Sequence, residues 1–129
     1  MNINREHWAT LDANNFQVSL LTDPYNRRIL AYAATRCVSA QELSEKLDIP
    51  IAVCYRRIKE MEAVGLIKVV ERYLNRKGKR VNIYKSMVKR AKIEFRDGCW
   101  MADLEMMGGS QYQWDGDSLF NPGENKNQQ

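Results

Sequence analysis

The amino-acid sequence predicts an α+β fold in which a run of short helices precedes two antiparallel β-hairpins. Helix-start signals and apolar residues at helical spacing occupy residues 23–64, and from Leu66 onward the apolar pattern becomes that of β-strands. Two turns containing glycine follow, within residues 75–80 and 96–99. With 129 residues, the chain has the size of one ordinary domain plus flanking segments.

The first long helix is predicted to begin at Asp23 and Pro24 and to run to about residue 35. Aspartate is a favoured N-cap, and proline suits the first helical position, where its missing N–H loses no hydrogen bond. Apolar residues then recur at helical spacing: Ile29, Leu30, Ala33 and Ala34. A short preceding helix is compatible with Phe16, Val18, Leu20 and Leu21.

Two further helices are predicted at a short interval. Ser39 and Glu42 have the spacing of a capping box, in which the serine oxygen accepts from the N3 amide and the glutamate reaches back to the cap amide. Pro50 opens the next helix, over residues 51–64, and Gly65 supplies the left-handed residue that ends it. The residues predicted to face inward are Leu43 and Leu47 on the first of these helices and Cys54, Ile58, Met61 and Val64 on the second.

A basic β-hairpin is predicted from residue 66 to residue 88. Its strands, residues 66–74 and 80–88, are rich in β-branched and aromatic side chains. The connection NRKGKR, residues 75–80, places four cations around Gly78. Like charges so close repel one another unless an anionic partner such as a run of phosphates neutralises them together. Glycine permits both a tight tip and a close approach to that partner.

A second hairpin is predicted around the Asp-Gly pair of residues 96–99, a type I′ turn candidate. With Asp97 and Gly98 as the two-residue loop, one face of the hairpin pairs Phe95 with Trp100, Ile93 with Ala102, and Ala91 with Leu104. The other face pairs Lys92 with Asp103 and Arg90 with Glu105. Apolar pattern and charge therefore agree on one register. The competing interpretation is a helix over residues 86–95 with Val88, Ala91 and Phe95 inward.

The chain is predicted to divide into four parts. Residues 1–16 are a polar, flexible N-terminal segment, and residues 17–90 form the main domain. Residues 91–107 are the C-terminal hairpin. Residues 108–129 are rich in Gly, Asn, Gln and Asp and are predicted to be a disordered acidic tail.

The net charge of +4 conceals a strong asymmetry along the chain. Residues 20–90 contain sixteen Lys and Arg against seven Asp and Glu, a balance of +9, whereas residues 91–129 contain three against seven, a balance of −4. A segment this positive attracts polyanions, of which nucleic acid is the commonest inside cells and an anionic membrane surface is the next.

Several other classes of protein are disfavoured by the sequence. Cys37, Cys54 and Cys99 are widely spaced, His7 is the only histidine, and we therefore expect neither a disulfide framework nor a metal site. No secretory segment or bilayer-spanning run is visible, so we expect a cytoplasmic protein with no membrane partner. Without a P-loop, a dinucleotide fingerprint or a nucleophile–base arrangement, we expect no cofactor and no enzymatic activity.

The order of these elements resembles a winged helix-turn-helix, in which three or four helices are followed by a basic β-hairpin wing. Similarity to bacterial and archaeal transcriptional regulators of the ArsR type is carried by LLTDPYNRRIL (20–30), AQELSEKLDIP (40–50) and YRRIKEMEAVGLIKV (55–69). The resemblance implies a sequence-specific regulator that binds double-stranded DNA. It places helix 51–64 in the major groove and wing 75–80 on the flanking backbone or in the minor groove.

The candidate DNA-binding residues lie on the outer face of the third long helix and on the wing. They are Ile51, Ala52, Tyr55, Arg56, Arg57, Lys59, Arg72, Arg76, Lys77, Lys79 and Arg80. The start of the helix departs from the family, since apolar residues replace the usual small polar ones and can contact only thymine methyl groups. Two alternatives stay open: Arg57 can form a surface ion pair, and Tyr55 can pack against the wing.

The apolar face of the second hairpin needs a cover. A second copy of the chain is one candidate, and the resemblance also implies homodimers that read two half-sites. The alternative is that the hairpin folds back on its own domain. For the whole protein, the alternative function is a winged-helix protein–protein interaction module of a transcription or nucleic-acid-processing complex.

Overall fold

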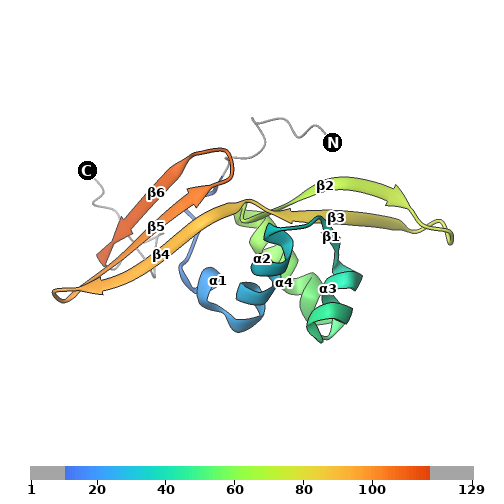
Figure 1. Cartoon of the computed structure of the whole chain (residues 1–129), viewed down its shortest axis with the longest axis horizontal. Helices are drawn as coiled ribbons and strands as arrows, with labels where there is room; N and C mark the ends of the chain where they lie inside the picture. Colours follow the sequence, from blue (N-terminus) through green and yellow to red (C-terminus); the bar gives the residue numbers. More distant parts are fainter. Residues whose placement is uncertain (1–10, 117–129) are drawn as a thin grey trace.

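The computed structural model describes residues 11–116, which form a group of helices and two three-stranded antiparallel sheets (Figure 1). The helices are α1 (Ser19–Thr22), α2 (Pro24–Ala34), α3 (Ala40–Leu47) and α4 (Ile51–Val64). The strands are β1 (Val38–Ser39), β2 (Ile67–Leu74), β3 (Arg80–Ser86), β4 (Val88–Arg96), β5 (Cys99–Met106) and β6 (Gln111–Asp115). The α+β class is thereby confirmed. No helix within residues 11–116 is long and apolar enough to cross a membrane.

The helix-start signals work largely as the sequence predicts. The Asp23 carboxylate accepts from the backbone N–H groups of Tyr25 and Asn26, and the Ser39 hydroxyl oxygen accepts from the N–H of Glu42 at 3.1 Å. The second half of the capping box is replaced by another contact. The Glu42 carboxylate accepts from the Tyr32 hydroxyl at 3.0 Å, so it ties α3 to α2 across the helix pair.

The turn between α3 and α4 is held by its own backbone and by one buried side chain. Asp48 adopts a left-handed conformation with φ of 55°, and the next residue, Ile49, is buried. The N–H of Ile49 donates to the carbonyl of Ser44 at 3.1 Å. At the other end of α4, Gly65 has φ of 94° and donates to carbonyls of the last turn, as the sequence predicts for a glycine C-cap.

The first sheet has the order β1-β3-β2 and holds the basic hairpin. β2 and β3 pair from Ile67 with Ser86 to Leu74 with Arg80, with a bulge between Val69 and Glu71. Beyond the bulge, all residues from 71 to 80 are exposed, so this half of the hairpin projects away from the core (Figure 1).

The second sheet has the order β4-β5-β6, and its hairpin has the predicted register. The pairs Phe95–Trp100, Ile93–Ala102, Ala91–Leu104, Lys92–Asp103 and Arg90–Glu105 are all present. The competing helix over residues 86–95 is wrong, because alternation of apolar and charged residues fits a strand better than a helix. β4 begins at Val88, so the expected domain boundary after residue 90 falls inside a strand.

Two segments expected to be disordered contribute ordered structure. Gln111–Asp115 lies in the expected tail and forms β6 on the edge of β5. Leu11 and Phe16 lie in the expected flexible segment but are buried, with 8% and 2% of their surfaces exposed. The rings of Phe16 and Trp114 meet with centroids 4.7 Å apart, so the two segments order each other by burying aromatic surface. The rest of these segments, residues 1–10 and 117–129, lies outside the described residues.

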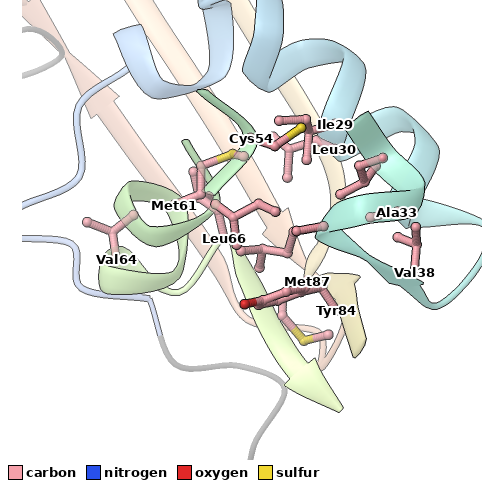
Figure 2. Close-up of a cluster of buried hydrophobic side chains, with 14 of the residues drawn as sticks. Ile29, Leu30, Ala33, Val38, Cys54, Met61, Val64, Leu66, Tyr84 and Met87 are labelled. Carbon is pink, nitrogen blue, oxygen red and sulfur yellow. The ribbon is translucent and has the colours of Figure 1, made fainter. Parts of the chain in front are cut away.

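One hydrophobic core joins the helices to both sheets. Figure 2 shows Ile29, Leu30, Cys54, Met61 and Met87 converging between α2, α4 and the first sheet. Leu104 and Met106 of β5 belong to the same cluster and are 1% and 0% exposed. The second hairpin is therefore packed on its own domain at this end, and only its distal end remains uncovered.

Candidate nucleic-acid interface

Helix α4 has a buried face and an open face. Cys54, Ile58 and Met61 are at most 1% exposed and anchor the helix in the core. Because these positions fix the rotation of α4, the opposite face is left in solvent. The predicted contact residues on that face are exposed: Ile51, Ala52, Tyr55, Arg56 and Lys59.

The amino-terminal end of α4 is also open. Pro50 is its N-cap and offers no side-chain hydrogen bond, so the first backbone N–H groups of the helix lack a capping partner. The helix dipole adds a partial positive charge at this end. A phosphate near Ile51 could accept hydrogen bonds from these N–H groups and would be attracted by the positive end of the helix dipole.

Arg57 lies on another side of α4 and faces the start of α2. Its Nη1 atom is 3.0 Å from the carboxylate of Asp23 and 3.8 Å from that of Glu60, and its guanidinium lies 5.7 Å from the Tyr25 ring centroid. The Nε atom is buried. Arg57 therefore ties α4 to α2, which is the ion-pair alternative left open by the sequence, and its DNA contact stays a prediction.

The tip of the β2–β3 hairpin is organised by Asn75. Its Oδ1 atom accepts from the N–H groups of Lys77 at 2.9 Å and Lys79 at 3.0 Å, and its carbonyl accepts from Gly78 at 2.9 Å. Gly78 has φ of 77°, a conformation that favours glycine. The role of Asn75 was missed from the sequence, although asparagine at the start of a turn is the signal for this motif.

The cations of this hairpin are not neutralised by neighbouring carboxylates. Within residues 11–116, no ion pair involves Arg72, Arg76, Lys77, Lys79 or Arg80, and none involves Arg56 or Lys59 of α4. The cations of the second sheet differ. Arg90 lies 3.4 Å from Glu105, and Arg96 lies 2.7 Å from Glu94. The hairpin and the open face of α4 thus carry cations without ion pairs, whereas the cations of the second sheet are paired.

The open face of α4 and the basic hairpin share a cleft. The cleft has a volume of about 420 Å³, and its lining includes Tyr55 of α4, Tyr73 of β2 and Arg80 of β3. Tyr55 remains 56% exposed, so it borders the cleft without being buried against the hairpin. The open face of α4 and the base of the hairpin therefore border one cleft, which Glu42 and Glu45 of α3 also line.

The three cysteines are free and belong to no cluster of potential metal ligands among the described residues. Burial raises the pKa of the Cys54 thiol, which keeps it protonated in the core. Cys37 and Cys99 are exposed and unpaired. No group of three His, Cys, Asp or Glu that could hold a metal ion occurs within residues 11–116.

Comparison with protein families matches residues 21–70 to a model described as a helix-turn-helix domain. The matched segment runs from α1 through α4 into β2, and so contains the helix whose outer face carries Arg56 and Lys59. Comparison with curated proteins gave no match. Residues 21–70 are therefore similar to a helix-turn-helix domain, and this similarity supports a DNA-binding regulator.

Proposed function

We propose that this protein is a transcriptional regulator that binds double-stranded DNA in a sequence-specific way. It would be of the winged helix-turn-helix, ArsR-like type. Helix α4 enters the major groove, and the β2–β3 hairpin acts as the wing on the flanking backbone or in the minor groove. The observation that carries the proposal is that the exposed cations of α4, Arg56 and Lys59, and the five cations of the adjacent hairpin form no ion pair within residues 11–116. The protein acts in the cytoplasm, as a homodimer and without catalysis.

On α4, the proposal divides base contacts from phosphate contacts. Arg56 has a planar guanidinium that can donate two parallel hydrogen bonds to O6 and N7 of guanine. Lys59 lies about one turn further along the same face and supplies a point charge to a phosphate. Ile51 and Ala52 can contact thymine methyl groups, so direct base readout depends chiefly on Arg56.

On the hairpin, the proposal assigns phosphate contacts to Arg72, Arg76, Lys77, Lys79 and Arg80. These contacts position the protein and carry no sequence information of their own. The ordered tip matters because Asn75 fixes the backbone that carries Lys77 and Lys79 before DNA arrives. Less conformational freedom is then lost on binding.

The alternative is a protein-binding module that uses the same face. Ile51, Tyr55, Tyr73 and Leu74 favour it, because they are 42%, 56%, 48% and 69% exposed. Large apolar side chains of this kind are enriched at protein–protein contacts. A protein-binding face does not require the five hairpin cations, which is why DNA remains the preferred partner.

The test is selection of bound sequences from a random duplex library, with the native protein and with Arg56→Ala. We expect the native protein to enrich a motif containing guanine. Arg56→Ala should lose preference at one position, by about 1–3 kcal/mol for a bidentate contact. Recovery of no duplex at low salt would refute DNA binding and favour the protein-binding module.

A further inference from the structure

Strand β4 is an edge strand with an open side. The second sheet has the order β4-β5-β6, so the nine residues Val88–Arg96 are paired only with β5 among the described residues. An exposed edge presents unpaired backbone N–H and C=O groups and can pair with another strand.

The turn between β4 and β5 fixes which backbone groups face outward. Asp97 and Gly98 have φ of 52° and 78°, and they form a two-residue loop with Arg96 opposite Cys99. In such a hairpin the residues flanking the loop are the hydrogen-bonded pair, and the pairs then alternate along the ladder. Ala91, Ile93 and Phe95 therefore belong to the pairs that are not hydrogen-bonded to β5. Their N–H and C=O groups point to the open edge.

The same part of the hairpin carries uncovered apolar side chains. Ile93 is 38% exposed and Phe95 is 58% exposed, whereas Ala102 and Leu104 further down the same face are buried. Trp100 is 44% exposed and its ring lies 4.9 Å from that of Phe95. Open backbone groups and apolar side chains thus occur together at the distal end of β4.

We propose that β4 pairs antiparallel with β4 of a second copy of this chain, about a two-fold axis at Ile93. Ile93 then faces its own copy, and Ala91 faces Phe95 of the second copy, so a large side chain meets a small one. On the other face of the sheet, Lys92 faces Glu94 of the second copy, twice by symmetry, in addition to the contacts of Glu94 within its own chain, 3.7 Å to Lys92 and 2.7 Å to Arg96. Charge complementarity and the outward backbone groups select the same pairing.

Two features bear on the choice of this register. A shift of two residues would place Lys92 opposite Lys92 and would draw the bulge between Val88 and Arg90 into the ladder. The chosen register uses only the regular segment, residues 91–95. It leaves Arg90 opposite Arg96, but each already has a carboxylate partner in its own chain, Glu105 at 3.4 Å and Glu94 at 2.7 Å.

This pairing leaves the nucleic-acid interface open. The β4–β5 turn and the tip of the β2–β3 hairpin lie at opposite ends of the molecule (Figure 1). A dimer joined at β4 therefore carries two helix-turn-helix units directed away from the two-fold axis. The dimer itself does not depend on DNA binding, and it is tested without DNA.

The first experiment is sedimentation equilibrium of the full chain, with four charge variants compared at tens of micromolar. We expect the native protein to be a dimer. Lys92→Glu and Glu94→Lys each create two like-charge pairs across the axis, and each should raise the dimer dissociation constant about tenfold. The double variant Lys92→Glu/Glu94→Lys restores opposite charges and should return to within about threefold of the native value. Lys89→Glu, outside the pairing segment, is the matched control.

The second experiment uses Ile93→Pro. Proline removes an N–H that points to the open edge, so the ladder with β5 keeps its hydrogen bonds while the second copy is excluded. We expect a folded monomer by circular dichroism and sedimentation. A monomeric native protein would overturn the inference, as would a dimer that Lys92→Glu leaves unchanged or tightens. In either case DNA binding by the native protein is measured separately, so the two proposals fail independently.

Discussion

Removing three cations from the tip of the β2–β3 hairpin tests the electrostatic part of the proposed function. The variant is Arg76→Ala/Lys77→Ala/Lys79→Ala. The turn itself should survive, because Asn75 accepts hydrogen bonds from the backbone N–H groups of Lys77 and Lys79 rather than from their side chains. A change in DNA binding would then report lost charge and not a lost fold.

The magnitude follows from counterion release. Each neutralised phosphate contributes about 0.9 to the slope of log affinity against log salt, so five hairpin cations contribute about 4.5 and two contribute about 1.8. Raising salt from about 50 to about 200 mM should therefore weaken the contribution of the native hairpin about 500-fold, and that of the triple variant about 12-fold. The loss should be the same for duplexes of any sequence.

Fluorescence anisotropy with a labelled random-sequence duplex measures both slopes. The control is Arg27→Ala/Lys89→Ala, which removes two exposed cations from α2 and β4, away from the hairpin. We expect the control to keep the native slope. If the triple variant also keeps the native slope, the hairpin does not contact phosphates and the assignment of its five cations is wrong.

Three further predictions concern other parts of the molecule. Arg57→Ala should lower the free energy of unfolding by about 1 kcal/mol, measured by urea denaturation, because it breaks the half-buried ion pair with Asp23. A large loss of DNA affinity without a loss of stability would instead place Arg57 at the DNA interface. Trp114→Ala should cost about 2 kcal/mol in the same assay, since the ring is only partly buried, and unchanged stability would mean that β6 is not docked. The midpoint of the Glu94 titration, measured by carbon-detected NMR, should lie below 4.5, because the hydrogen bond from Arg96 lowers the pKa of Glu94. The folded state therefore favours the ionised carboxylate. Any contribution of this carboxylate to stability is present above the pKa of the unfolded state and is lost as the pH falls through the folded-state pKa. A midpoint at or above 4.5 would show that this hydrogen bond does not form in solution.

The helices and both hairpins were predictable because their signals are local. The N-cap at Asp23, the C-cap at Gly65 and the Asp97-Gly98 turn depend on residues only a few positions apart, and each element begins or ends where those signals place it. The register of β4 with β5 followed from the alternation of apolar and charged residues. The open face of α4 followed from its helical spacing, once the buried positions were assigned.

The features that were missed depend on contacts between distant segments. β6 and the Leu11–Phe16 stretch are each polar in composition and lack a period of their own. They become ordered because Phe16 and Trp114 bury one another's rings, a contact across almost the whole described chain. Arg57 was ambiguous for the same reason, since its partner Asp23 lies far away in sequence. The sequence shows a cation on a helix and does not show which carboxylate faces it.

The two hairpins differ less in their number of cations than in whether those cations form ion pairs with carboxylates. This difference in ion pairing distinguishes the functions proposed for them. The basic segment identified in the sequence includes the start of β4, so composition alone would extend the nucleic-acid surface along that strand. In the structure, Lys89 and Arg90 face Glu105 across the sheet, and Lys92 and Arg96 face Glu94 on their own strand. A phosphate approaching β4 would have to displace these carboxylates, whereas at the tip of the β2–β3 hairpin it meets cations with no such competitor. The two proposals therefore assign the same residue types to DNA at one end of the molecule and to a second copy of the chain at the other.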